Sequence, residues 1–161
     1  MIIRPPGNND WRDIGALGEQ LVRAHHAFDS HRFIGPDRLR GDVYVARVRE
    51  EIDRGSAAVL VADEAERVVG FVFVGVERAS WKELRDEAGY VHDLVVDPAS
   101  RDKGVGRALV SSAIEWLRAR GVERIMLWTA HDNVAAQGLF RTLGFRPTMI
   151  EMTLGVRDSQ R

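Results

Sequence analysis

Residues 88–118 combine three patterns that restrict the possible fold more than any other part of the chain. The run AGYVHDLVVD has the apolar, alternating character of a strand and ends at Pro98. The turn RDKGVGR follows, with two glycines among basic residues. An apolar stripe then repeats at helical spacing, formed by Val105, Leu109, Ala113, Trp116 and Leu117. A glycine-rich, basic turn therefore lies where a strand passes into a helix.

The composition favours a globular domain. The 161 residues are long enough to bury a hydrophobic core, and the net charge is −1. This charge, and the lack of an apolar run of ~18 residues, lead us to expect no nucleic-acid and no membrane partner. The start MIIRPPGNND has no recognisable secretory signal, so we expect a cytoplasmic location. The chain has no cysteine, which excludes disulfides, thiolate metal sites and a cysteine nucleophile.

The remaining patterns predict strands and helices in alternation. A short strand starts the chain, and a helix begins near Trp11 with Asp10 as its cap. A second helix is expected at about residues 38–54, before a hairpin of AAVLVAD and VVGFVFVGV. After the basic turn and its helix, we expect a strand over VERIMLWTA, a helix over DNVAAQGLFRTLG and a last strand over MIEMTLGV. The strand VERIMLWTA is apolar on both faces, which favours an internal position in the sheet.

This order of elements predicts an α/β fold of the mixed α+β kind, with a central mixed sheet and helices on both faces. We assign residues 1–156 to one domain and residues 157–161 to a C-terminal tail. Trp116 and Trp128 fit core positions, and Asp132 or Asn133 is expected to cap the last helix. The short space for the last strand suggests a sheet that a second subunit completes, so a homodimer is predicted.

The turn RDKGVGR has the properties of an anion site. The first amides of a helix have no partner within the helix, and the peptide dipoles favour a negative charge there. Gly104 and Gly106 have no Cβ, so a phosphate can approach the backbone, and the basic side chains add positive charge. The spacing matches neither the dinucleotide-binding fingerprint nor the P-loop. A diphosphate is the expected ligand; a plain turn with a solvated charge cluster is the alternative.

Two motifs resemble those of the GCN5-related N-acetyltransferase superfamily. LVVDPASRDKGVGRAL resembles its acetyl-CoA motif, in which a strand leads into [QR]-x-x-G-x-[GA] at a helix start. NVAAQGLFRTLGF resembles its signature N-x-x-A-x-x-[LF]-Y-x-x-x-G-F. The resemblance implies a largely antiparallel sheet that splays between two parallel strands, acetyl-CoA as co-substrate, and no metal. The acceptor would be a small-molecule amine or a protein amine that attacks the thioester directly in a ternary complex.

The resemblance also implies a cofactor site. The backbone before the turn would pair with the pantetheine arm, and the amides of the turn would hold the diphosphate. Asn133 would hydrogen-bond the pantetheine, and Phe140 would lie near the thioester sulfur. A backbone N–H near Leu94 or Val95 would stabilise the oxyanion. The predicted cofactor-binding residues are Leu94, Val95, Val96, Arg101, Asp102, Lys103, Gly104, Val105, Gly106, Arg107, Asn133 and Phe140.

The catalytic residues are predicted from the central strand. Phe140 stands where the superfamily usually has a tyrosine that is taken to protonate the departing thiolate. An alkyl amine of pKa about 10.4 is mostly protonated at neutral pH, so a general base is worth more than a general acid. His92 stands where related polyamine acetyltransferases have a glutamate proposed as the base, and Tyr90 is the candidate acid. The alternatives are a partly buried histidine bonded to backbone and an aromatic packing residue. Strand alternation puts Tyr90 and His92 on one face and Asp93 on the other.

The acceptor site is expected beside the segment between the first two helices. Asp29 or Glu83 would attract a cationic amine; solvent-facing polar residues are the alternative. The histidines around Asp29 form only a weak metal pattern, and no metal is predicted. Because Phe140 replaces the usual acid, the alternative function is a catalytically impaired acyl-CoA-binding module that acts as a sensor or partner. The predicted substrate-binding residues are Phe28, Asp29, His31, Trp81 and His131.

Overall fold

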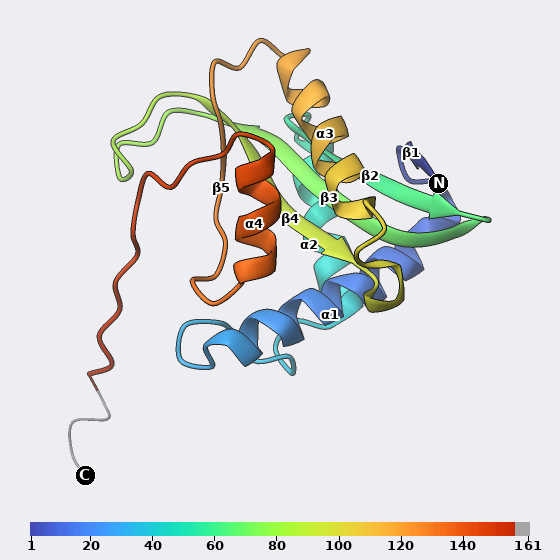
Figure 1. The fold of residues 1–161 in the computed structure, drawn as a ribbon, viewed down its shortest axis with the longest axis horizontal. Helices are drawn as coiled ribbons and strands as arrows, with labels where there is room; N and C mark the ends of the chain where they lie inside the picture. Colours follow the sequence, from blue (N-terminus) through green and yellow to red (C-terminus); the bar gives the residue numbers. More distant parts are fainter. Residues whose placement is uncertain (157–161) are drawn as a thin grey trace.

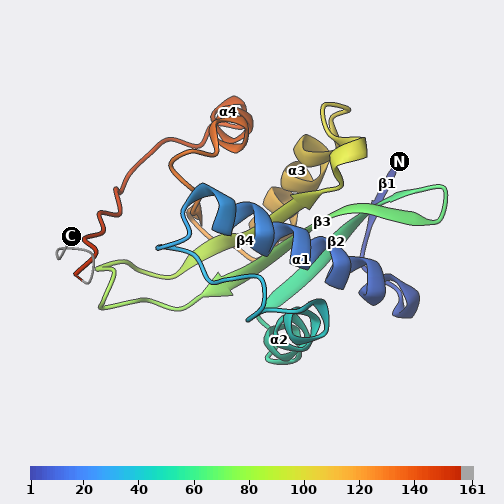
Figure 2. The ribbon, with the colours of Figure 1, turned by 90° about the horizontal axis from the view of Figure 1, so that it is seen from below.

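The computed structural model describes residues 1–156, and the predicted tail at 157–161 lies outside the described residues. The central element of residues 1–156 is a five-stranded sheet with helices on both faces (Figures 1 and 2). None of the helices in residues 1–156 combines the length and the apolar character needed to cross a membrane. The elements, in chain order, are β1 (Ile2–Arg4), the 3-10 helix η1 (Asn8–Asp10), α1 (Trp11–Phe28), α2 (Gly41–Asp53), β2 (Ala57–Glu64), β3 (Arg67–Glu77), β4 (Ala88–Val96), the 3-10 helix η2 (Pro98–Ser100), α3 (Val105–Arg118), β5 (Ile125–Leu127) and α4 (Val134–Thr142).

The strands lie in the order β1-β2-β3-β4-β5. β1 to β4 pair antiparallel, and β4 pairs with β5 in parallel. This confirms the predicted mixed, largely antiparallel sheet. The parallel pair is short, since it extends only from Gly89–Ile125 to Val91–Leu127. The C-terminal half of β4 therefore has a strand neighbour on one side only.

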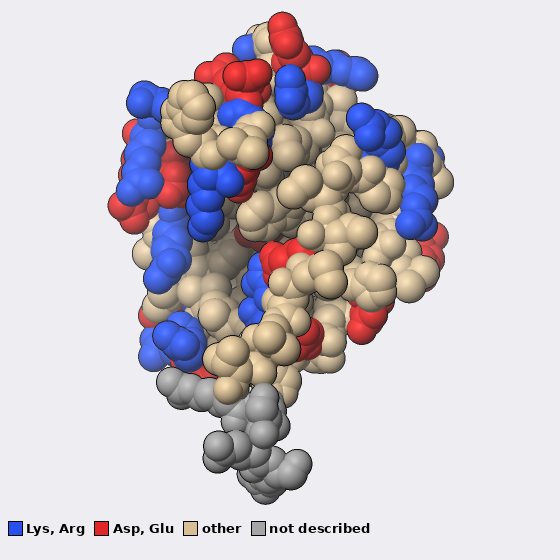
Figure 3. Space-filling model, turned by 90° about the vertical axis from the view of Figure 1, so that its left-hand side faces the viewer, with Lys and Arg blue, Asp and Glu red and all other residues tan. Residues whose placement is uncertain are grey.

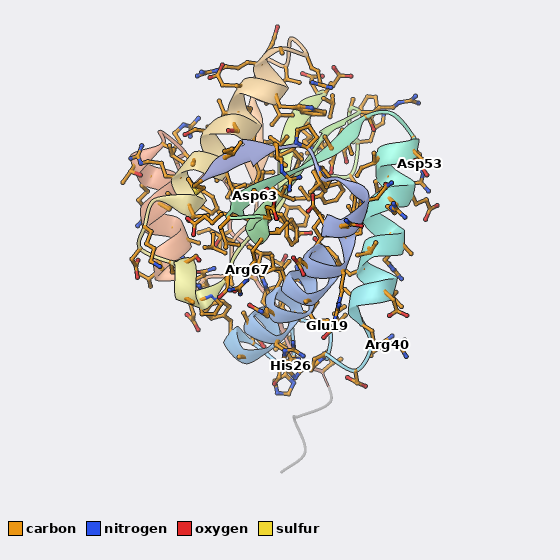
Figure 4. The ribbon with its side chains drawn as sticks, turned by 90° about the vertical axis from the view of Figure 1, so that its right-hand side faces the viewer. Glu19, His26, Arg40, Asp53, Asp63 and Arg67 are labelled. Atoms are coloured by element: carbon orange, nitrogen blue, oxygen red, sulfur yellow. The ribbon has the colours of Figure 1, made fainter. Side chains whose placement is uncertain are left out.

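Helices α1 and α2 cover one face of the sheet, and α3 and α4 lie on the other (Figure 2). Ile14, Leu17 and Tyr44 pack with Phe71 on the first face, and Leu109 and Leu117 pack with Val72 and Val74 on the second. The carboxylate of Glu19 accepts a hydrogen bond from the Gly41 N–H at 2.8 Å, and Figure 4 shows Glu19 beside the start of α2. These contacts hold α1 and α2 to each other and to the first face of the sheet.

Two strand predictions in the last third of the chain are wrong. β5 has three half-buried residues and forms an edge of the described sheet, not an internal strand. The segment MIEMTLGV forms no strand, because β5 offers so short an edge that the segment has no strand to join. Its apolar side chains are instead exposed by 82–89%: Met149, Ile150, Met152, Leu154 and Val156. The prediction that Trp128 is a core residue is also wrong, since its side chain is 67% exposed.

One helix cap differs from the prediction, and a second is decided between its two candidates. The side chain of Asp10 makes no capping hydrogen bond to α1; it accepts bonds from the Gly7 N–H and from Arg4, each at 2.6 Å. Asn133, not Asp132, caps α4, with its Oδ1 accepting from the Ala136 N–H at 3.2 Å. Asx residues at adjacent positions compete for one cap, and sequence alone does not show which has the extended backbone conformation.

Candidate functional site

The gap between β4 and α4 exposes one backbone edge of β4. The Asp97 N–H donates to the Val69 carbonyl of β3 at 2.9 Å. Peptide groups alternate in direction along a strand, so those of Leu94 and Val96 point away from β3, into the gap. Val95 is different, since its peptide group faces β3 and its side chain is buried in the core. An extended ligand could therefore pair with β4 through Leu94 and Val96.

Two cavities, of about 120 and 60 Å³, open beside this edge, and both are lined by His92 and Trp128. Figure 3 looks onto this side of the molecule, where the surface is hollowed next to acidic and basic side chains. The larger, first cavity is lined by Glu77, Glu83, Tyr90, Val91, His92 and Trp128. The second is lined by Leu21, His25, His92, Asp93, Leu94, Trp128, Thr129, Asn133, Ala136 and Phe140.

A β-bulge sets the direction of the central side chains. Phe73 pairs with Asp93 while Val74 pairs with Val91, so His92 is the extra residue of β4. Asp93 consequently lies on the α2 side, where its carboxylate accepts a hydrogen bond from the Tyr44 hydroxyl at 2.8 Å. Simple alternation, which puts His92 and Asp93 on opposite faces, applies only to a strand without a bulge, and the inserted residue breaks it here.

The imidazole of His92 lies between two aromatic rings over a glycine. Its centroid is 4.9 Å from that of Phe73 and 5.6 Å from that of Tyr90, on which it stacks. A Cβ at Gly75 would lie 3.0 Å from Nε2, so a larger residue there would crowd the imidazole. Nδ1 is 3.7 Å from Oε1 of Glu77. Burial lowers the pKa of His92, and the charge of Glu77 only partly opposes this, so the imidazole is neutral at neutral pH and has a lone pair that can accept a proton.

Tyr90 borders the same cavity as a neutral phenol. Burial, followed by the charge of Glu83, raises the pKa of Tyr90 above its usual value. The guanidinium of Arg85 lies 5.1 Å from the centre of its ring. A phenol that keeps its proton at neutral pH can donate a hydrogen bond, so Tyr90 fits the predicted acid. The same observations fit the alternative, an aromatic residue that only packs.

Asp93 is a buried structural carboxyl group. Burial raises its pKa, and the Tyr44 hydrogen bond opposes that shift only in part. Such a carboxyl stabilises the fold fully below its unfolded pKa of about 3.9, and this contribution is lost as the pH rises through the raised folded pKa. Its partner is a tyrosine of α2, so the bond holds α2 to β4.

We expect Asp93→Asn to raise the melting temperature at pH 7 by about 2–4 °C, the shift that ~1 kcal/mol produces in a domain of this size. The amide oxygen still accepts from Tyr44, and the cost of a buried charge is removed. The gain should be smaller at pH 4, as thermal melts at both values would show. Tyr44→Phe, which removes the donor, should lower stability. A gain that is larger at pH 4 than at pH 7 would contradict this account.

The turn before α3 presents its backbone amides to solvent. Asp102 and Gly104 have left-handed backbone angles, with φ of 60° and 83°. The first backbone hydrogen bond of α3 runs from the Ala108 N–H to the Gly104 carbonyl at 3.0 Å. Within residues 1–156, the amides at 102–107 donate to no protein acceptor. This is the arrangement that binds phosphate at a helix N-terminus.

The basic side chains around the turn are not equally available. Arg101 donates through Nε to the Val96 carbonyl at 3.2 Å, and Lys103 donates through Nζ to the Ala99 carbonyl at 2.8 Å. Both thereby brace the turn. Arg107 is exposed, on the first turn of α3. Backbone amides therefore supply most of the anion-binding capacity.

Helix α4 forms the other wall of the gap. A Cβ at Gly106 would lie 3.3 Å from Leu139 of α4 and 3.7 Å from Val96, so Gly106 lies at the mouth of the gap. Phe140 is 7% exposed, and its ring lies 5.9 Å from that of Phe145. Asn133 uses Oδ1 for its cap, which leaves its amide NH₂ to donate into the second cavity.

The five predicted substrate-binding residues lie outside both cavities, whereas Glu83, the alternative to Asp29 for attracting an amine, lines the first cavity. Trp81 is 91% exposed, and Phe28 contacts the ring of His25. Asp29 accepts hydrogen bonds from the amides of His31 and Arg32, which closes the turn after α1. His131 is close in sequence to Thr129 and Asn133, which line the second cavity, but it does not line that cavity itself. The roles of these residues stay predictions.

Sequence reasoning missed several residues that the fold brings to the cavities. Trp128 has apolar neighbours that favour the core, although the resemblance also implies that residues of RIMLWTA line the active site, and Glu77 is an unremarkable strand end. His25 was weighed only as a metal ligand, yet it lines the second cavity. In residues 1–156, no group of three or more histidine or acidic side chains is placed to hold a metal ion. A signal for Trp128 existed in its position near the end of a strand next to the splay.

Comparisons with known proteins give a consistent result. Residues 23–145 match the family model described as acetyltransferase (GNAT) family. A mycothiol acetyltransferase of Nocardia farcinica is 32% identical over 136 residues, which cover 83% of this chain and 43% of that protein. The chain thus spans less than half the length of the mycothiol acetyltransferases that it matches.

Solved structures share the fold. A tetramutant of the BH1408 protein of Bacillus halodurans has a TM-score of 0.83 at 24% identity and covers 97% of this chain and 100% of its own. The aminoglycoside N-acetyltransferase AAC(6')-Iy in complex with CoA has a TM-score of 0.76 at 18% identity and covers 97% and 94%. At these identities the likeness concerns the fold.

Proposed function

The chain belongs to the GNAT family of acetyltransferases, and we propose that it moves the acetyl group of acetyl-CoA to a primary amine by direct attack in a ternary complex. One arrangement carries this proposal: a neutral histidine, the free edge of β4 and the unpartnered amides before α3 lie in succession along β4 and the turn after it. The gap has the parts needed to bind a diphosphate, an extended amide chain and a reacting carbonyl in sequence.

The donor would bind along the gap from α3 to the second cavity. The amides at 102–107 hold the diphosphate, with Arg107 adding positive charge. The Leu94 carbonyl and the Val96 N–H pair with the pantetheine amides as an added strand would, since the Val96 carbonyl accepts from Arg101. The amide of Asn133 donates to the same arm, and the acetyl group lies between Leu94 and Phe140. The Leu94 N–H points to where the carbonyl oxygen gains negative charge.

The acceptor would enter through the first cavity. His92 takes a proton from the ammonium, directly or through one water, and the neutral amine attacks the thioester carbon. The C–N bond forms, the C–S bond breaks as the tetrahedral intermediate collapses, and the nitrogen loses its second proton to water, from which Tyr90 regains the proton that it donates. Tyr90 is the group proposed to return a proton to the thiolate. The chain has no cysteine, so no cysteinyl acyl-enzyme precedes this attack.

The test is thiol release from acetyl-CoA in the presence of an amine panel, run beside calorimetric binding of acetyl-CoA. Amine-dependent release with mass-confirmed acetylated product is expected. Binding without turnover on every amine would favour the rival function, an acyl-CoA-binding module that serves as a sensor or partner. Phe140 in place of tyrosine is the observation that favours the rival.

We expect Phe140→Tyr to raise kcat, by up to about thirtyfold where departure of the thiolate limits the rate. A thiol of pKa about 8.5 leaves with a mismatch of ~1.5 units at pH 7, or ~2 kcal/mol, which sets the upper bound. Phe145→Tyr adds the same hydroxyl to the adjacent ring, outside the cavities, and should leave kcat unchanged. Equal effects of the two variants in steady-state assays would show that Phe140 is not near the sulfur.

We propose a cytoplasmic homodimer in which the segment 149–156 adds to the sheet of a second copy. Its five exposed apolar side chains are unusual on a water-facing surface, and β5 leaves a free edge. Light scattering after size-exclusion chromatography should give twice the monomer mass, and Ile150→Asp with Met152→Asp should halve it. A monomer mass for the parent protein would contradict the dimer.

A further inference from the structure

The wall of the first cavity is acidic. The carboxylates of Glu77 and Glu83 line it together with the rings of Tyr90 and Trp128, and no lysine or arginine is among its lining residues. The second cavity also has no lysine or arginine among its lining residues, and its acidic residue is Asp93. Arg78 and Lys82 are exposed on the connection before β4 and line neither cavity. A ligand that enters the first cavity therefore meets negative charge and aromatic surface.

One arginine lies behind this wall, but its hydrogen-bonding capacity is used. The side chain of Arg85 is 8% exposed and pairs with both Glu77 and Glu83. Its Nη1 donates to the carbonyls of Arg78 and Asp86 at 3.0 and 3.2 Å. A guanidinium has five N–H donors, and four of these are engaged. An incoming carboxylate would find at most one free N–H on Arg85, and could form a two-point contact only by displacing a glutamate.

The charges that face the cavity favour a cation. Two carboxylates with one arginine leave a net charge of −1 on the wall, and aromatic faces attract ammonium groups. Trp128 is 67% exposed, and its ring meets that of Tyr90 edge to face at 6.3 Å. A carboxylate brought within a few ångströms of Glu77 would instead be repelled, and more strongly here than in water because the site is partly buried.

We infer that the acceptor is an amine that has no carboxylate on the carbon bearing its amino group. This inference rests on the proposed function, since it assumes that the amine reacts beside His92. An α-amino acid with its nitrogen at His92 must place its carboxylate about two bonds away, against Glu77 or Asp93. Amines, amino sugars and aminoacyl amides avoid this contact; free α-amino acids do not.

Matched acceptor pairs test the inference: tyramine with tyrosine, histamine with histidine, and phenethylamine with phenylalanine. Tyrosine methyl ester keeps the side chain and removes only the negative charge. For each pair, calorimetric binding to the CoA-loaded protein and kcat/KM with acetyl-CoA are measured. We expect the decarboxylated amines and the ester to exceed the acids at least tenfold in both quantities.

Charge variants identify the source of the discrimination. Glu83→Gln should reduce the ratio within each pair several-fold, whereas Lys82→Gln, on the same connection but outside the cavity, should leave it unchanged. Equal or better binding of the acids, or no measurable binding of any pair member, would overturn the inference. Selective binding of the amines without turnover would support the inference and overturn the proposed transfer reaction.

Discussion

Replacing His92 with alanine is expected to lower kcat at pH 7 by about 10²–10³-fold while the affinity for acetyl-CoA changes less than twofold. Removal of a general base typically has an effect of this size. An alkyl amine is neutral to about one part in 10³ at pH 7, so the attack depends on a group that removes its proton. His92 lines both cavities but lies away from the amides at 102–107, so diphosphate binding should be spared.

The pH dependence separates a base from a packing residue. In the parent protein kcat should rise with pH through a pKa below the usual 6.5 of histidine, because burial disfavours the imidazolium. His92→Ala should lose that inflection, and its deficit should shrink as the pH approaches the pKa of the amine. A pH-independent deficit, or an unchanged rate at pH 7, would remove His92 as the base. Calorimetric binding of acetyl-CoA and a thermal melt establish that the variant is folded.

Gly106→Val is expected to weaken acetyl-CoA binding by about a hundredfold or more, which corresponds to ~2.7 kcal/mol. Gly106 lies where the first turn of α3 meets α4 and the end of β4. A branched side chain there projects into the mouth of the gap, with a Cβ already 3.3 Å from Leu139. The valine side chain would occupy the space that the diphosphate and the first amides of the pantetheine arm need.

The matched control is Gly138→Val. Gly138 lies in α4, and a Cβ there would meet no heavy atom within 4 Å. The same substitution on that exposed position should leave the Kd for acetyl-CoA within about twofold. Native affinity in Gly106→Val, with the melting temperature of the control, would show that the diphosphate binds elsewhere. Gly106→Ala provides a smaller step if the valine variant does not fold.

The sequence predicted the parts of this site that depend on local patterns. The turn before α3 was predicted from three local features: the strand that ends at Pro98, the two glycines and the helical stripe from Val105. Each of these features depends on residues within a few positions. The hairpin of β2 and β3 was predicted for the same reason. The GNAT resemblance then supplied the splay between β4 and β5, and the parallel pairing that stops at Val91 agrees with it.

The features that were missed depend on contacts between distant segments. The bulge at His92 arises from its pairing with β3 and turned Asp93 toward Tyr44, which no periodicity in β4 shows. Trp128 is as apolar as a core residue but lies on the wall of a cavity. Met152 and its apolar neighbours have a strand pattern, yet the sheet of one chain offers them no partner.

The central claim is that the amides before α3 bind the diphosphate of acetyl-CoA, and a titration followed by amide NMR tests it most directly. The ¹H–¹⁵N resonances of residues 102–107 should shift saturably and more than those elsewhere, with smaller shifts at Leu94 and Val96. Pantetheine without the diphosphate should leave residues 102–107 unshifted. No saturable shift at 102–107 with acetyl-CoA, or saturable shifts confined to another surface, would contradict the account.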